Sequence, residues 1–156
     1  MPRKKCVAKR EVNADPKYGD VLIQKFINKI MLQGKKSTAE KIVYDALEAA
    51  CKGKKENPVD VFKIALDNVR PQVMVKSTRI GGATYQVPTE ISLENSQALG
   101  MKWMITFSRN RSEKGMALKL AGEIDEAFGK KGNSFKRKED THKMAEANKA
   151  FAHFKW

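Results

Sequence analysis

Residue types suited to catalysis, metal binding or disulfide formation are scarce in this sequence. Its 156 residues include two cysteines and two histidines. Cys6 and Cys51 are too few and too far apart for a disulfide framework or a zinc knuckle, which favours reduced thiols in a cytoplasmic protein. His142 and His153, on a polar segment, fit surface residues that contact solvent or phosphate better than metal ligands or a catalytic base. We therefore expect no metal site and no catalytic residue.

Cofactor motifs are also missing. Gly34-Lys35-Lys36-Ser37 shares only the end of a phosphate-binding loop, because no glycine stands five positions before Gly34 and no strand precedes it. The sequence has neither a glycine-rich dinucleotide fingerprint nor a His-Glu-x-x-His pair. An enzyme is thus the least favoured class, and no cofactor is expected.

No apolar run in the sequence approaches the roughly 20 residues of a membrane span. The basic segment 1–10 lacks a following apolar core, so it does not fit a secretory signal. The hydrophobic fraction of 41% is nevertheless typical of a globular protein, and 156 residues can bury a core. We expect one folded domain without a membrane segment.

Acidic residues are few relative to basic ones: 18 Asp and Glu stand against 31 Lys and Arg, which gives a net charge of +13. Self-repulsion of this size disfavours a compact chain unless a polyanion neutralises it. Nucleic acid is the leading candidate. An anionic membrane surface is the alternative, but it requires a basic amphipathic helix with bulky apolar residues, which the last segment lacks over most of its length.

The apolar periodicity predicts a mainly α fold: a single domain of about six helices with one protruding two-stranded β-hairpin. Leu99, Trp103 and Phe107 recur at helical spacing and are predicted to face the core. The predicted parts are a basic N-terminal arm at 1–19, helices at 20–71, the hairpin at 72–90, helices at 91–129, and a basic C-terminal helix and tail at 130–156.

Capping residues predict where the early helices begin. Asp20 is expected to cap the first helix. Ser37 with Glu40 three residues later matches a capping box at the start of the second. Asn57 followed by Pro58 is the order expected for the cap and first position of the third.

The hairpin is predicted from two runs rich in Val, Thr and Tyr that meet at Gly81 and Gly82. Lys76 and Arg79 make its first strand basic. Pro88 has no backbone donor, so the second strand cannot pair on both sides there. Because an isolated two-stranded ribbon is marginally stable, we expect it to lean on the helices or on another molecule.

The last segment is polar nearly all round. Gly132 and Asn133 are predicted to break the chain, with the final helix starting near Phe135. Alanines give this helix good propensity but little bulky apolar surface, so it is expected to lie against something else, anchored at its end by aromatic residues such as Phe151.

Basic residues gather at the tail, at connections, on the hairpin and at the start of the last segment, where they can reach several separate phosphates. Aromatic stacking residues are few, and Tyr85 is the only one on the ribbon. This pattern favours recognition of folded RNA through its shape and phosphates.

Six blocks of the sequence then identify a known family, and they follow in the order Asp15-Pro-Lys-Tyr-Gly19, Phe26-Ile-Asn-Lys-Ile-Met31, Gly34-Lys-Lys-Ser-Thr-Ala39, Asn68-Val-Arg-Pro71, Gly81-Gly-Ala-Thr-Tyr-Gln-Val-Pro88 and Lys138-Glu-Asp-Thr-His-Lys-Met-Ala-Glu-Ala-Asn-Lys-Ala-Phe151. On these residues the chain resembles the bacterial small-subunit ribosomal protein seven family over nearly its whole length.

The resemblance implies a cytoplasmic, ribosomal protein that binds small-subunit ribosomal RNA and nucleates assembly of the head. The residues it places on ribosomal RNA are Arg3, Lys4, Lys5, Lys9, Arg10, Lys35, Lys36, Arg109, Arg111 and Lys114. Those it places near messenger RNA and the exit-site transfer RNA are Lys76, Arg79, Gly81, Gly82, Tyr85, Lys136, Arg137, Lys138, His142, Lys143 and Lys149. Neighbouring ribosomal proteins of the head and platform complete the implied partners.

Two stretches depart from the family's pattern. Thr78 stands where the family commonly has a second basic residue beside Arg79, and 92–96 replaces a more Arg-rich stretch, so no RNA contact is carried over to 92–96. A second hypothesis for the chain is regulation of translation, in which excess protein binds a messenger fold, such as its own, that mimics the ribosomal site.

Overall fold

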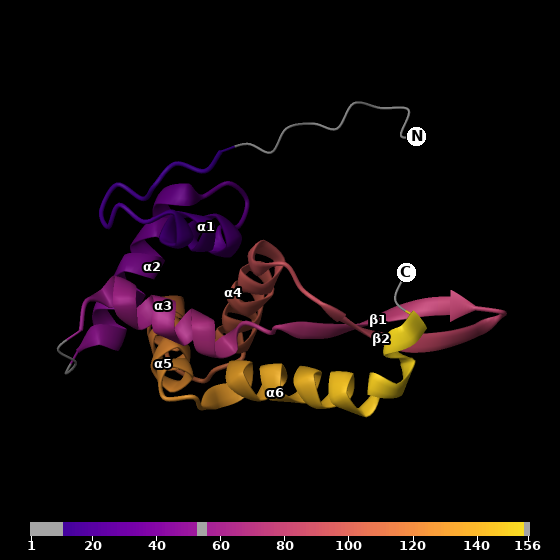
Figure 1. Ribbon diagram of the computed structural model, residues 1–156. Helices are drawn as coiled ribbons and strands as arrows, with labels where there is room; N and C mark the ends of the chain where they lie inside the picture. The colour runs from indigo at the N-terminus through magenta and orange to yellow at the C-terminus, as the bar shows by residue number, and fades with distance from the viewer. Residues whose placement is uncertain (1–10, 53–55, 155–156) are drawn as a thin grey trace.

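The described residues, 11–52 and 56–154 of a computed structural model, form a helical body with a projecting arm (Figure 1). They contain six α-helices, one antiparallel hairpin and a terminal 3-10 helix. In chain order these are α1 (Val21–Ile30), α2 (Lys36–Cys51), α3 (Pro58–Val69), β1 (Val73–Ile80), β2 (Ala83–Glu90), α4 (Leu93–Arg109), α5 (Met116–Phe128), α6 (Gly132–Ala147) and η1 (Lys149–Phe154). The mainly α fold class expected from the sequence is confirmed.

The core of the body lies where α5 packs against α2, α3 and α4. Apolar residues repeat three and four positions apart on these helices, so each helix buries one face. Phe26 of α1 and Phe62 of α3 are fully buried and pack on each other, with ring centroids 4.9 Å apart. Gly100 allows α4 to pack closely on α3, since a Cβ there would lie 3.1 Å from a methyl of Leu66.

Two of the predicted helix starts are confirmed and two are wrong. Asp20 caps α1 by accepting a hydrogen bond from the N–H of Leu22, and Asn57 stands at the N-cap of α3. The second helix begins at Lys36, so Ser37 lies inside its first turn and makes no cap there. Gly132 opens α6 instead of breaking the chain, because a carboxylate from α5 accepts the N–H of Ser134 in its first turn.

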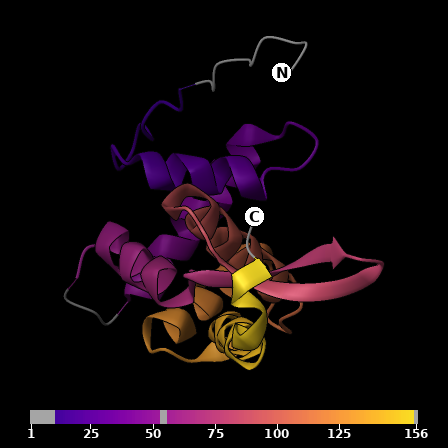
Figure 2. The ribbon, with the colours of Figure 1, turned by 45° about the vertical axis from the view of Figure 1, so that its right-hand side comes forward.

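The hairpin pairs Val73 with Glu90 at its base and Ile80 with Ala83 at its end. Gly81 and Gly82 form the turn with φ of 57° and 93°. These angles lie in the left-handed region that favours glycine, as expected for a tight turn between twisted strands. Figures 1 and 2 both show the hairpin projecting away from the helical body.

The hairpin leans on the C-terminal helices, as predicted. At its root the N–H of Gln72 donates to Nε2 of His142 on α6, over 3.1 Å. Nearer the end, the ring of Tyr85 packs on Phe151 of η1 with centroids 5.4 Å apart. Tyr85 is paired with Thr78 across the hairpin. Residues 79–84 therefore form the part of the ribbon that extends beyond the contact with Phe151. The hairpin, α6 and η1 together form the C-terminal arm.

Candidate nucleic-acid interface

The cations predicted in the basic N-terminal arm lie outside the described residues. They are Arg3, Lys4, Lys5, Lys9 and Arg10. The chain that follows them is anchored to the body by a turn at 15–18. The buried Asp15 carboxylate accepts hydrogen bonds from the N–H groups of Lys17 and Tyr18 and from the hydroxyl of Tyr44 on α2. The family block that begins at Asp15 is therefore an anchor that fixes where the preceding segment meets the body.

Two exposed cations lie where the α1–α2 loop meets α2: Lys35 is the last residue of the loop and Lys36 the first of the helix. Gln33 and Gly34 adopt φ of 53° and 74°, which turn the chain sharply before α2. The ammonium of Lys36 lies 3.7 Å from the carboxylate of Glu40, an exposed i,i+4 pair worth little in water. Both ammonium groups thus remain accessible to phosphate.

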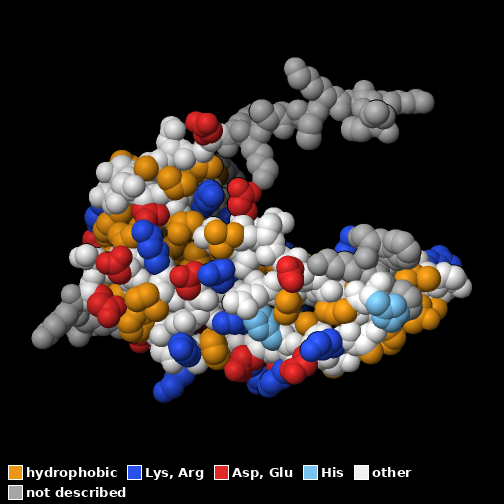
Figure 3. All heavy atoms as spheres, in the orientation of Figure 1, with side chains coloured by type: hydrophobic (Ala, Val, Ile, Leu, Met, Phe, Trp, Pro, Cys, Tyr) orange, Lys and Arg blue, Asp and Glu red, His pale blue; other side chains and the backbone are white. Residues whose placement is uncertain are grey.

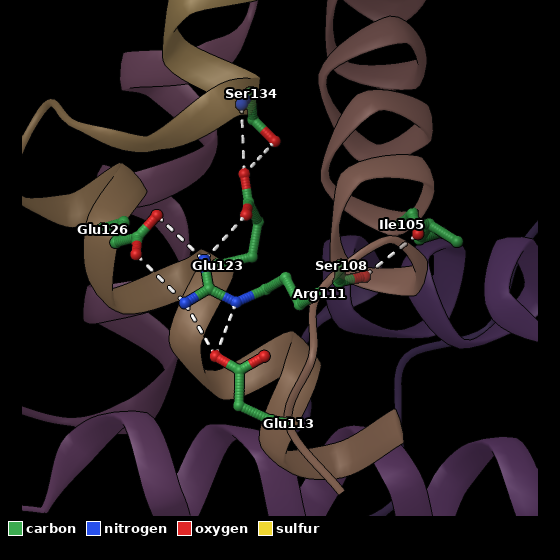
Figure 4. Close-up of polar contacts among 7 residues, drawn as sticks. All are labelled: Ile105, Ser108, Arg111, Glu113, Glu123, Glu126 and Ser134. Atoms are coloured by element: carbon green, nitrogen blue, oxygen red, sulfur yellow. Dashed lines mark hydrogen bonds and ion pairs between the residues drawn. The ribbon is translucent and has the colours of Figure 1, made fainter. Parts of the chain in front are cut away.

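Three predicted RNA-binding residues lie at the link between α4 and α5, and they differ in their exposure to solvent. Arg109 and Lys114 are exposed. Arg111 instead points into the body, where its guanidinium meets three carboxylates (Figure 4). Its side chain is 18% exposed, whereas that of Glu123 is 0% exposed.

The Arg111 network joins the α4–α5 link, α5 and α6. Nε of Arg111 donates to Glu113 over 2.8 Å, and Nη1 donates to Glu123 over 3.2 Å. The carboxylate of Glu126 accepts a hydrogen bond from Nη2 and forms an ion pair with Nη1. The other oxygen of Glu123 accepts the N–H and hydroxyl of Ser134 at the start of α6. The hydrogen bond from Arg111 lowers the pKa of Glu113. Because these bonds occupy the guanidinium fork, Arg111 orients α6 and is poorly placed to bind RNA.

The cations of α6 also divide into two groups. Lys138 turns inward and donates to the carbonyl of Asn68 at the end of α3 over 2.8 Å. Burial, together with the charge of Arg70, lowers the pKa of Lys138. The exposed cations of α6 and η1 are Lys136, Arg137, Lys143 and Lys149. Figure 3 shows basic and acidic side chains alternating along this helix.

On the hairpin, Lys76 and Arg79 are exposed, while Tyr85 is half-buried against Phe151. His142 lies at the root of the ribbon, where burial and the charge of Lys138 lower its pKa. Its neutral Nε2 is needed there as a hydrogen-bond acceptor. Two of the predicted messenger- or transfer-RNA residues, Tyr85 and His142, therefore hold the C-terminal arm together.

Two cations that the sequence did not point to lie across a groove between α1 and α4. The ammonium of Lys29 donates to the carbonyl of Ala98 over 2.7 Å. Burial and the charge of Lys102 lower its pKa. Both lysines line a groove of about 510 Å³ that also contains Glu90. Seventy-odd positions separate Lys29 and Lys102 in the chain, so only the packing of α1 on α4 brings them together.

Within 11–52 and 56–154, no group of three His, Cys, Asp or Glu side chains is placed to hold a metal ion. The helices of this part of the chain are also too short or too polar to cross a membrane.

The family described as Ribosomal protein S7p/S5e matches residues 2–149 of the chain. The chain belongs to this family. Curated relatives called small ribosomal subunit protein uS7 align over all 156 residues and over their own full lengths. The identity is 54% for that of Anaeromyxobacter sp. (strain K), and 55% for those of Nitrosococcus oceani and Myxococcus xanthus.

Membership of the family confirms the resemblance drawn from the six sequence blocks. It also confirms that the chain is a ribosomal protein and not an enzyme. Family membership gives no role to individual residues. The structure adds which cations are exposed and which are held by partners inside the protein.

Proposed function

We propose that the chain is a structural constituent of the small ribosomal subunit that binds ribosomal RNA directly and nucleates assembly of the head. The observation that carries this proposal is the exposure of cations at the loops of a packed helical body. They are Lys35, Lys36, Arg109 and Lys114. Charges fixed on separate loops of a rigid body suit RNA whose phosphates are held in a defined shape.

The basic N-terminal segment extends this surface. Its cations Arg3, Lys4, Lys5, Lys9 and Arg10 add phosphate contacts. Lys29 and Lys102 supply a further pair of charges between α1 and α4. Arg111 is assigned a positioning role instead of an RNA contact, because its guanidinium is held by three carboxylates.

The C-terminal arm serves a second role, close to messenger RNA and the exit-site transfer RNA. Its reach supports this role more than its charge, since the ribbon contributes only Lys76 and Arg79. Lys136, Arg137, Lys143 and Lys149 place further charges beside it. Ribosomal proteins of the head and platform are the proposed neighbours.

Chemical probing of head-domain ribosomal RNA tests this division of labour. The full chain is compared with variants that lack residues 1–10 or 73–89. Loss of 1–10 should remove part of the backbone protection and weaken binding. Loss of 73–89 should leave the backbone protection made by the helical body in place and should not abolish binding, while impairing ribosomes that contain the variant. Loss of RNA binding by a folded 73–89 deletion would contradict the proposal.

The surface formed by the loop cations could also bind a messenger RNA and so regulate translation. A messenger that repeats the shape and phosphate positions of the ribosomal site would bind the same loop cations. Such a messenger should compete with ribosomal RNA for the protein in a filter-binding assay. Simultaneous binding of both RNAs would exclude a shared surface.

A further inference from the structure

A groove of about 340 Å³ opens where the root of the hairpin, α4 and α6 meet. Its volume lies at the lower end of the roughly 300–1,000 Å³ typical of small-ligand sites. Among its lining residues are Met74, Gln86, Leu99, Trp103, Arg137 and Met144. A cavity of this size admits one planar group and excludes a helix or strand.

The walls of the groove are apolar side chains that remain exposed. Met74 is 37% exposed and Met144 is 44% exposed, although both flank a hydrophobic floor. Trp103, which the helical periodicity assigns to the core, is only half-buried and lines the groove. Exposed apolar surface rimmed by polar groups is characteristic of binding sites.

Polar groups at the edge retain unused hydrogen-bonding capacity. The amide nitrogen of Gln86 donates to the hydroxyl of Ser77, which leaves its second N–H and a carbonyl lone pair. The hydroxyl of Thr141 donates to the carbonyl of Arg137, so its oxygen can still accept. Arg137 is exposed and forms no ion pair with any described residue.

We propose that this groove binds one unstacked nucleobase of RNA. Trp103 supplies the stacking surface, Met74 and Met144 flank the base, and Arg137 contacts an adjoining phosphate. Gln86 offers a donor and an acceptor to the base edge. The proposal deepens the proposed function, since it rests on RNA being the ligand. The cationic side chain of Arg137 beside the aromatic surface of Trp103 favours a nucleotide over an apolar side chain from a neighbouring protein.

The test compares Trp103→Phe, which keeps an aromatic ring, with Trp103→Leu, which keeps only apolar volume. Both are made in full-length protein and assayed for binding to head-domain ribosomal RNA. Base–aromatic stacking is worth about 1–3 kcal/mol per base, so the Leu variant should bind roughly 5- to 150-fold more weakly. The Phe variant should bind nearly as tightly as the parent. Base-specific probing should show one unpaired nucleotide that only the Leu variant fails to protect.

Three further measurements separate binding from folding. In a Trp156→Phe background, the fluorescence of Trp103 should change saturably as RNA is added. Arg137→Gln, on the surface of α6, should reduce the slope of log affinity against log salt by roughly 0.7–0.9. Leu118→Ala is the control, because Leu118 is 55% exposed on α5, away from the groove. It should bind as the parent does.

Equal affinity and equal base protection by the Phe and Leu variants would overturn the nucleobase site. Weakened binding to a neighbouring ribosomal protein, with RNA binding unchanged, would also overturn it and assign the groove to a protein side chain. In both cases a retained salt dependence would leave the proposed function standing. Failure of the parent protein to bind the RNA would instead contradict the proposed function itself.

Discussion

At the residue scale, two arginines that are nearly adjacent in the chain differ in what they can bind. Arg109 ends α4 with its side chain in solvent, whereas Arg111 is enclosed by Glu113, Glu123 and Glu126. The sequence shows both as members of one basic linker. It cannot separate them, because the carboxylates that enclose Arg111 come mainly from α5 and are recruited only when that helix packs.

Arg111→Ala should destabilise the fold strongly, because it leaves the carboxylate of Glu123 buried without its cation. The expected loss is about 3 kcal/mol or more in the free energy of unfolding. Arg109→Ala is the matched control and should change stability by less than about 0.5 kcal/mol. Urea denaturation of both variants measures the difference. Equal stability of the two variants would show that the Arg111 network does not hold α6 in place.

His142 should make the attachment of the hairpin sensitive to acid. Burial and the charge of Lys138 lower its pKa below the ordinary value of 6.5. The unfolded chain therefore binds a proton more readily, so this contribution to stability is complete above about pH 6.5 and declines as the pH falls below it. Protonation of Nε2 also removes the acceptor for Gln72. His142 also lines a groove between the hairpin and α6, where the other charged side chains are Glu90, Glu146 and Lys149.

The measurement is unfolding free energy against pH for the parent and for His142→Gln, whose side-chain carbonyl can accept the same hydrogen bond without titrating. The parent should lose more stability than the variant between pH 7 and pH 5, values chosen to bracket the ordinary histidine pKa. Identical pH profiles would mean that His142 makes no such contribution.

At the element scale, helix existence is predictable from apolar periodicity and helix starts are less so. Asp20 and Asn57 lie next to the helices that they begin, and both predictions are correct. The start of α6 depends on Glu123, whose carboxylate arrives from α5 to accept the N–H of Ser134. A cap supplied by a distant residue leaves no local pattern, so Gly132 reads as a break.

The hairpin and η1 should be coupled through Tyr85 and Phe151. Their rings lie 5.4 Å apart between centroids, and such pairs contribute about 0.5–1.5 kcal/mol beyond burial. A double-mutant cycle with Tyr85→Ala and Phe151→Ala should show a coupling energy in this range. Native-state hydrogen exchange of the hairpin amides reports it locally. Strictly additive effects of the two substitutions would indicate that the ribbon is held at its root alone.

At the scale of the whole molecule, the net charge of +13 predicts a polyanionic ligand without identifying its binding surface. Exposed side chains remain at Lys35, Lys36, Arg109 and Lys114, of which Lys36 makes only a long ion pair with Glu40. Lys17, Lys63 and Arg70 form closer ion pairs with Glu48, Asp20 and Asp67. Lys29 and Lys102 join the exposed set through packing. The charge, the hairpin and the exposed loop cations were thus predictable from the sequence, whereas the internal pairing of Arg111 and the meeting of Lys29 with Lys102 were not.

The body is proposed to make most of the phosphate contacts with ribosomal RNA, while the C-terminal arm reaches toward messenger and transfer RNA. The most direct test is affinity for head-domain ribosomal RNA as a function of salt. We compare the parent with a loop variant, in which Lys35, Lys36, Arg109 and Lys114 are replaced by Gln, and a hairpin variant with Lys76 and Arg79 replaced by Gln. The parent should lose about 10³-fold or more in affinity between roughly 50 and 200 mM salt, as 6–10 phosphate contacts require.

The loop variant should reduce the slope of log affinity against log salt by roughly 3 to 4, close to one unit per lost phosphate contact. The hairpin variant should leave that slope nearly unchanged. A salt-insensitive parent, or a slope that depends on the hairpin and not on the loops, would contradict the account.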